Sequence, residues 1–106
     1  KYEQTLVQQH DKTYIETGHS WYIVDKVWLQ GWLSFVHEDQ LGPIPGAISN
    51  QRLLKKDGKT PKEGLEKGQS YRGVNQHVWN IFHQIYGGGP AIVRARLDIY
   101  AEPLIV

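Results

Sequence analysis

Hydrophobic residues recur at spacings of three and four along three stretches of the chain, and this period predicts three helices. The first stretch runs from Tyr2 to Glu16 and is followed by Gly18, a helix stop signal. The second begins after Asp25, whose carboxylate can accept the free backbone N–H groups of a first helical turn. Its apolar stripe comprises Trp28, Leu29, Trp32, Leu33, Phe35 and Val36. Gly31 costs this helix about 1 kcal/mol relative to Ala, and a close contact between helices at that position would explain it.

The third helical stretch carries signals at both ends. Asn75 can cap its start, Gly87 can adopt the left-handed conformation that ends a helix, and Pro90 prevents its continuation. The expected apolar face comprises Val78, Trp79, Phe82, Ile85 and Tyr86. A phosphate loop follows a strand and opens a helix, whereas these glycines close a helix. The run "GGGP" is therefore interpreted as a helix end and a turn into the next strand.

Three shorter stretches are rich in β-branched and aromatic residues, as strands are. They cover residues 20–24, 70–74 and 91–100. The last one alternates, as a half-buried strand of an antiparallel sheet does, with Val93, Ala95, Leu97 and Ile99 on one face and Arg94, Arg96 and Asp98 on the other. Three helices packed with a small three-stranded antiparallel sheet define an α+β fold, which we expect to be a single domain over residues 1–106.

The connection "LGPIPGAISNQRLL", residues 41–54, is rich in Pro and Gly yet too apolar for an ordinary solvated loop. Its second half offers the expected core anchors Ile48, Leu53 and Leu54. Asn50 is expected to satisfy backbone groups in the turn, as Asn side chains do. The first half offers candidates for an exposed contact with a partner, namely Leu41, Pro43, Ile44 and Pro45. The following residues 55–67 are rich in Lys and are expected to form a solvated loop.

Composition narrows the chemistry of the chain. There is no Cys, which excludes a thiol nucleophile within these residues and fits a reducing compartment. The serines lack a nucleophile-elbow context. His77 and His83 are six residues apart, so on one helix they point in roughly opposite directions, and His10 and His19 are isolated in the sequence. We therefore expect no catalytic residue, no metal and no cofactor.

The formal net charge is +1, which provides no general attraction to nucleic acid or to a membrane surface, and no apolar run has the length of a membrane span. One alternative stays open: Arg94 and Arg96 share a strand face, and Arg72 on a neighbouring strand could join them. Such a face could bind an acidic peptide or a phosphate backbone. The simpler interpretation is a solvated face with Asp98 as counter-charge. The chain does not begin with Met, so we expect it to be an excised piece of a longer protein.

Three blocks together resemble one family: "WYIVDKVWLQGWLSFV", "PGAISNQRLL" and "SYRGVNQHVWNIFHQIYGGGPAIVRA". In content and order they are similar to the DUSP domain, the domain present in ubiquitin-specific proteases. They are most similar to the tandem C-terminal DUSP domains of von Hippel–Lindau-interacting deubiquitinases. The motif positions are Trp21, Trp28, Trp32, Pro45, Gly46, Ile48, Asn50, Tyr71, Trp79, Tyr86, Gly87, Gly88 and Pro90. Ala47 stands where the family's Pro-Gly-Pro-Ile loop has its second proline, which loosens the backbone there.

The resemblance implies a tripod-like fold and a non-catalytic interaction or regulatory module of a ubiquitin-specific cysteine protease, a deubiquitinase. It implies that the catalytic Cys of the parent thiol protease lies in another domain. It also implies protein partners or substrates of that parent, no nucleic acid, no membrane and a monomeric isolated domain. The expected location is cytoplasmic, perinuclear or centrosomal for the parent. A stand-alone hydrolase and a purely architectural spacer are the remaining alternatives.

Overall fold

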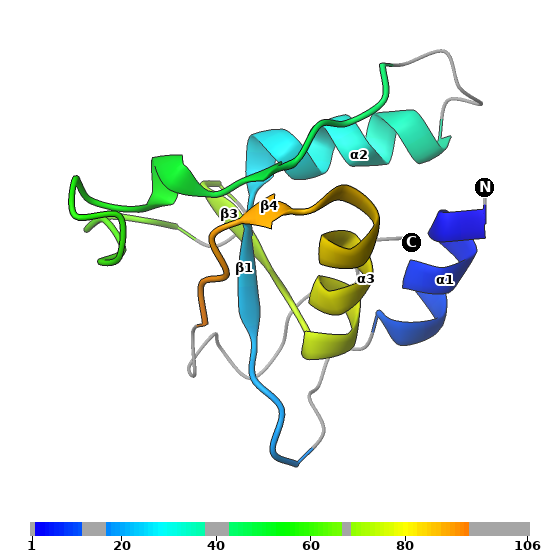
Figure 1. Ribbon diagram of the computed structural model, residues 1–106, viewed down its shortest axis with the longest axis horizontal. Coiled ribbons are helices and arrows are strands. Elements are labelled where there is room, and N and C mark those ends of the chain that lie inside the picture. Colours follow the sequence, from blue (N-terminus) through cyan, green and yellow to red (C-terminus); the bar gives the residue numbers. More distant parts are fainter. Residues whose placement is uncertain (1, 12–16, 38–42, 67–68, 94–106) are drawn as a thin grey trace.

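The computed structural model describes residues 2–11, 17–37, 43–66 and 69–93, and Figure 1 shows their arrangement. The elements follow one another along the chain as helix, strand, helix, strand, 3₁₀ turn, strand, helix and strand. In order they are α1 (Tyr2–His10), β1 (Tyr22–Asp25), α2 (Lys26–His37), β2 (Ile48–Ser49), η1 (Gln51–Leu53), β3 (Tyr71–Val74), α3 (Gln76–Tyr86) and β4 (Gly88–Gly89). The predicted α+β class is confirmed. The first predicted helix is observed as α1, but it ends at His10, so its expected continuation is wrong at Asp11, and residues 12–16 of that prediction lie outside the described part.

β1 and β3 form an antiparallel pair in which Tyr22 lies opposite Val74 and Asp25 opposite Tyr71. On the other edge of β1, Tyr22 forms an antiparallel bridge with Val93, and the Ile23 N–H donates to the Ile92 carbonyl at 3.0 Å. The described start of the predicted strand at 91–100 therefore lies along the second edge of β1, in the place of a third antiparallel strand. Residues 94–100 lie outside the described part, so its full extent stays a prediction.

The burial expected at the start of that strand is wrong. The alternating pattern places Val93 on the apolar face, yet Val93 is 52% exposed, while its neighbour Ile92 is buried. Ile92 packs into a cluster with Trp21, Ile23, Leu53, Leu54 and Tyr71. Because successive side chains of an extended chain point to opposite sides, burial of Ile92 turns Val93 outward.

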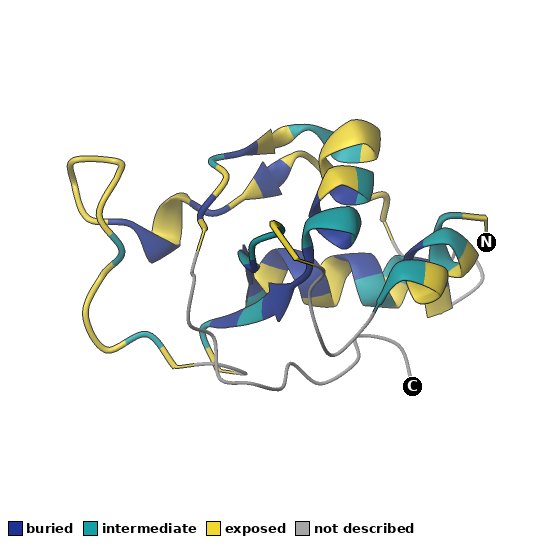
Figure 2. Ribbon diagram, turned by 90° about the horizontal axis from the view of Figure 1, so that it is seen from below, coloured by how far each residue is buried: buried dark blue, intermediate teal, exposed yellow. Residues whose placement is uncertain are grey.

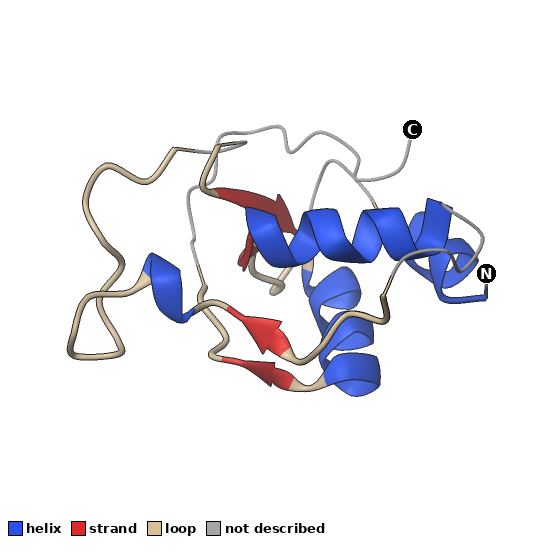
Figure 3. Ribbon diagram, turned by 90° about the horizontal axis from the view of Figure 1, so that it is seen from above, coloured by secondary structure: helices blue, strands red, loops and turns tan. Residues whose placement is uncertain are grey.

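A second sheet was not anticipated from the sequence. β2 and β4 pair in parallel, with Ile48 opposite Gly88, so the glycine run is a strand as well as a helix end. A Cβ on Gly88 would lie 2.4 Å from the Ile48 carbonyl oxygen, and Gly88 has a φ of +85°. Only glycine permits both this close approach and this backbone conformation. Figure 3 shows the two short strands side by side, next to α3.

The main core lies where the helices meet the β1–β3 pair, as the buried residues in Figure 2 show. Trp32 is fully buried and meets Phe82 edge-on, with ring centroids 4.9 Å apart. Tyr22 stacks on Trp79 with ring planes 6° from parallel. The expected stripe of the second helix is thus the buried face of α2, with Leu33 and Phe35 only partly buried.

The predicted starts of the second and third helices and the predicted end of the third are observed, whereas the first helix ends at His10 and not at the Gly18 stop signal. The Asp25 carboxylate accepts the Val27 N–H at 2.8 Å, and the Asn75 side chain accepts the Val78 N–H at 2.9 Å. Gly87 ends α3 with a φ of +66°. The expectation for Gly31 is wrong: this residue is exposed, and a Cβ built on it meets nothing within 4 Å. Among the described helices, none is both long enough and apolar enough to span a membrane.

Candidate interaction site

The apolar connection after α2 divides at Ile48 into two parts with opposite exposure. We call Pro43–Ala47 the outer strip and Ile48–Leu54 the anchor segment. Ile44 in the outer strip is 76% exposed, whereas Ile48 in the anchor segment is 2% exposed. Leu53 and Leu54, the other two expected core anchors, also lie in the anchor segment and are buried. Leu41, a further candidate for partner contact, lies outside the described residues.

The outer strip is held against α2 by a side chain. It runs alongside this helix in the opposite direction, as Figures 1 and 3 show. The Trp28 indole Nε1–H donates to the Gly46 carbonyl at 2.9 Å. Pro43 is exposed and Pro45 is partly buried. A buried indole therefore fixes the strip while the Ile44 side chain points into solvent.

Asn50 joins three segments that are distant in the sequence. Its side-chain oxygen accepts the Asp25 N–H at 2.8 Å, and its Nδ2 donates to the carbonyls of Ile23 and Pro90, each at 3.1 Å. One donor and two acceptors surround this amide, so only one orientation satisfies all three. The expectation that Asn50 satisfies backbone groups of its own turn is wrong: the fully buried side chain makes no capping hydrogen bond to η1, and these three partners lie in β1 and after β4.

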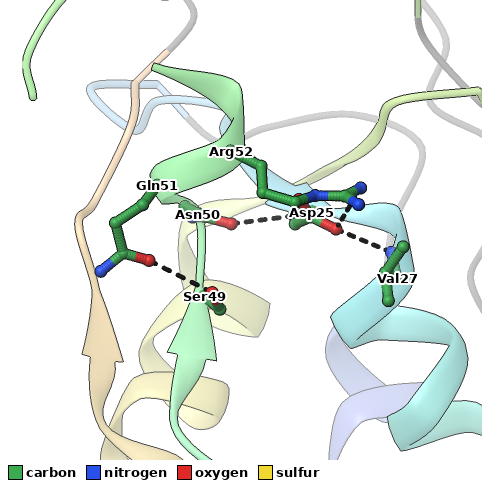
Figure 4. A network of polar contacts seen from close by, with 6 residues as sticks. All are labelled: Asp25, Val27, Ser49, Asn50, Gln51 and Arg52. Atoms are coloured by element: carbon green, nitrogen blue, oxygen red, sulfur yellow. Dashed lines mark hydrogen bonds and ion pairs between the residues drawn. The ribbon is translucent and has the colours of Figure 1, made fainter. Parts of the chain in front are cut away.

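Asp25 has two roles at the junction of β1 and α2, as Figure 4 shows. Besides capping α2, its carboxylate receives Arg52 Nε at 2.9 Å and Arg52 Nη2 at 3.2 Å. The side chain of Asp25 is 2% exposed and that of Arg52 is 60% exposed. Sequence analysis identified the cap but missed Arg52, because 27 residues separate the partners and no periodicity relates them.

A surface hollow of about 230 Å³ lies beside this ion pair. It is lined by Asp25, Val27, Trp28, Ser49 and Arg52. The hollow thus lies between the first turn of α2 and the strand β2. Val27 is an exposed apolar residue on its wall.

Other motif residues have packing roles in the structure. Trp21 and Tyr71 lie in the cluster around Ile92, and Trp79 lies in the main core. The Glu3 carboxylate accepts the Trp32 indole N–H at 3.0 Å and the Tyr86 hydroxyl, which ties α1 to both other helices. Burial, together with the hydrogen bond to Glu3, raises the pKa of Tyr86 well above its usual value.

The histidines are arranged differently from the expectation that His10 and His19 are isolated. The His77 ring lies between them, with centroid distances of 5.2 Å to His10 and 4.9 Å to His19. His83 instead stacks against Trp79. Across the described ranges, no three side chains of His, Asp or Glu are placed to hold a metal ion. We assign the His10, His19 and His77 contacts to packing between α1, the segment before β1, and α3.

The basic strand face cannot be assembled from the described residues. Arg72 lies in β3 and is partly buried. Arg94 and Arg96 lie outside the described part of the chain. Their proposed joint surface stays a prediction.

The solvated loop after the anchor segment has its own polar organisation. The Asp57 carboxylate accepts the backbone N–H groups of Lys59 and Thr60 and the Thr60 hydroxyl, at 2.8, 2.9 and 2.5 Å. These hydrogen bonds, the Thr60 hydroxyl first, lower the pKa of Asp57 from 3.8 to about 2. A local network therefore orders an exposed turn without burial.

Comparison with known proteins identifies the family. The model of the DUSP domain matches residues 18–98, which is most of the chain, and the chain therefore belongs to the DUSP domain family. One relative is ubiquitin carboxyl-terminal hydrolase 5 of Arabidopsis thaliana, which is 27% identical over 104 aligned residues. The match covers 73% of this chain and 11% of that protein. The chain therefore spans only about a tenth of the length of that relative.

Proposed function

We propose that this domain is a non-catalytic interaction module of a ubiquitin-specific cysteine protease, where it recruits substrates or regulatory partners. Membership of the DUSP family and the likeness to a ubiquitin carboxyl-terminal hydrolase support a deubiquitinase as the parent. The cysteine-free sequence supports a location of the catalytic thiol in another part of that parent. The resemblance to the tandem domains of von Hippel–Lindau-interacting deubiquitinases, and a cytoplasmic location, belong to the same proposal.

The observation that carries the interaction role is the exposed outer strip. The Trp28 indole N–H holds the strip at Gly46, which lowers the cost of ordering the strip when a partner contacts the solvent-facing Ile44. An apolar side chain on a backbone that is held before binding loses less conformational freedom at an interface. The outer strip therefore combines exposure with preorganisation, which an ordinary solvated loop lacks.

The test is removal of this domain from the full-length parent protein. We expect turnover of a small fluorogenic ubiquitin substrate to persist, because the catalytic residues lie elsewhere. We expect the set of crosslinked partners, and the choice of ubiquitinated protein substrates, to change. Unchanged partners and unchanged substrate choice after deletion would contradict the proposed function.

A further inference from the structure

We propose that Asp57 and Gly58 form a covalent modification site, where the peptide bond between them rearranges to an isoaspartyl bond at a rate set by the opening of one surface turn. The reaction needs only atoms of this chain and water. Both residues are exposed, so water reaches the site. The proposal does not depend on the interaction function, because it concerns the chemistry of the chain itself.

The reaction is an attack of the backbone on a side chain. The Gly58 nitrogen attacks the side-chain carbon Cγ of the protonated Asp57 carboxyl group: a C–N bond forms, a C–O bond breaks, and one water leaves. Water then opens the five-membered imide ring. Opening at the main-chain carbonyl leaves the chain linked through Cγ, which is isoaspartate, and opening at Cγ restores Asp57. Glycine has no side chain to shield its nitrogen, so an Asp-Gly sequence hinders this attack least.

The fold requires this reactive pair. Residues 55–60 form the turn of a hairpin that projects from one end of the molecule (Figure 1), and the Lys55 N–H donates to the Thr60 carbonyl at 2.7 Å. Gly58 has a φ of +71°, a conformation that favours glycine. The Asp57 side chain organises the rest of the turn through its hydrogen bonds. The two residues that build the turn are therefore the two that can rearrange.

The closed turn holds the reacting groups away from each other. Both Asp57 carboxylate oxygens face the residues after Gly58: Oδ1 accepts the N–H groups of Lys59 and Thr60, and Oδ2 accepts the Thr60 hydroxyl. The Gly58 N–H donates to the Lys55 carbonyl at 2.9 Å. The attack needs the nitrogen and Cγ to be close and aligned, so these hydrogen bonds must break first. The rearrangement therefore proceeds from the opened turn.

The same hydrogen bonds keep the carboxyl group ionised. The Thr60 hydroxyl, the N–H groups of Thr60 and Lys59, and the charge of Lys55 lower the pKa of Asp57 from 3.8 to about 2. A carboxyl oxygen leaves as water only from the protonated group. Because the lower pKa reduces the protonated fraction at any pH above 3.8, the closed turn slows the reaction by a second route. Opening the turn removes both obstacles together.

Rearrangement alters the surface around the turn. Isoaspartate adds one carbon to the main chain before Gly58, so the pairing of Lys55 with Thr60 loses its geometry. Gly58 and Lys59 line one side of a cleft of about 350 Å³, and Ala91 and Ile92 line another part of it. We call this space the hairpin cleft. The modification therefore reshapes the hairpin cleft as well as the turn.

The test is incubation of this chain in neutral buffer prepared with ¹⁸O-labelled water, beside a capped peptide of residues 55–62. Chromatography and fragmentation of proteolytic peptides measure isoaspartate at residue 57, and each passage through the imide adds one labelled oxygen. The peptide lacks the buried residues that hold the ends of the hairpin. We expect it to rearrange at least roughly tenfold faster than the folded chain, as the difference in protonated fraction alone requires.

A matched pair of variants tests the control by the turn. Thr60→Val removes the hydroxyl that binds Asp57 and should rearrange several-fold faster than the unmodified chain, whereas Thr60→Ser keeps a hydroxyl and should rearrange at nearly the unmodified rate. The proposal is overturned if the peptide forms no isoaspartate, if peptide and folded chain rearrange equally fast, or if Thr60→Val is as slow as Thr60→Ser.

NMR of the rearranged chain tests the effect on the hairpin cleft. The backbone amide signals of Ala91 and Ile92 should shift together with those of Lys59 and Thr60, because both groups of residues belong to or adjoin the cleft. Unchanged signals of Ala91 and Ile92 would contradict the reshaping of the hairpin cleft.

Discussion

The outer strip and the anchor segment are adjacent in the sequence and similarly rich in apolar residues, but they are stabilised in different ways. Ile48 pairs through its backbone with β4 and is buried in the core. Ile44 is mostly exposed, and its strip is held through the backbone of Gly46 rather than through its own side chain. The comparison shows that hydrophobicity alone does not decide burial. The difference here is that the Ile48 side chain faces the main core, whereas the Ile44 side chain faces solvent.

The largest expected effect separates the two isoleucines. Ile48→Asp places a carboxylate in a site that is 2% exposed, and should lower the free energy of unfolding by more than about 4 kcal/mol. Denaturant unfolding followed by tryptophan fluorescence measures this change. If Ile48→Asp unfolds at the same denaturant concentration as the unmodified chain, Ile48 does not belong to a buried anchor segment and this part of the account is contradicted.

A second large effect is expected at Asn50, where the anchor segment is tied to β1. Asn50→Asp replaces the Nδ2 donor by an oxygen facing the carbonyls of Ile23 and Pro90, and should cost about 3 kcal/mol or more. The same unfolding assay measures it, with Gln51→Glu as a control on an exposed neighbour. A cost similar to that of the control would show that the amide does not join these segments.

A smaller effect of opposite sign on the free energy of unfolding is expected in α2, the helix against which the outer strip lies. Gly31→Ala should raise the free energy of unfolding by about 1 kcal/mol, because an exposed glycine inside a helix is replaced at a position with free space. Calorimetry would show this as a higher unfolding midpoint. A lower midpoint would indicate a contact at Gly31 that the structure does not contain.

The smallest effect concerns the turn at Asp57, which is exposed like the outer strip but ordered by its own hydrogen bonds. The pKa of Asp57 is lowered to about 2, so its contribution to the turn is present in full above pH 3.8 and is lost as the pH falls through about 2. Thr60→Val removes the leading cause and should move the pKa back towards 3.8. NMR titration of the carboxyl group measures both values, and an unchanged pKa in Thr60→Val would refute this cause.

Local signals predicted local structure well. The caps at Asp25 and Asn75, the stripe of α2 and the glycine at the end of α3 each depend on residues within a few positions of one another. Asn50, with partners 25, 27 and 40 residues away, could be assigned only to a turn. Long-range pairing has no period in a sequence, so the parallel β2–β4 pair was missed for the same reason.

The candidate site was predicted in part. The exposure of Pro43 and Ile44 agrees with the expectation for a partner contact, although their role stays a prediction. Val27 and Arg52 were not identified, because each belongs to a pattern that a core helix or an ordinary turn would also produce. Only the ion pair with the buried Asp25 brings Arg52 to the hollow.

The most direct test of the account is the binding of partners by the parent protein carrying Ile44→Asp, measured as the amount of each crosslinked partner relative to the unmodified parent. Because Ile44 is 76% exposed, the variant should keep the free energy of unfolding of its domain within about 0.5 kcal/mol. The account predicts that crosslinked partners of the domain then fall at least roughly tenfold, as loss of a central apolar contact does. Undiminished crosslinking by the folded variant, or unfolding of the domain, would contradict the assignment of the outer strip to recognition.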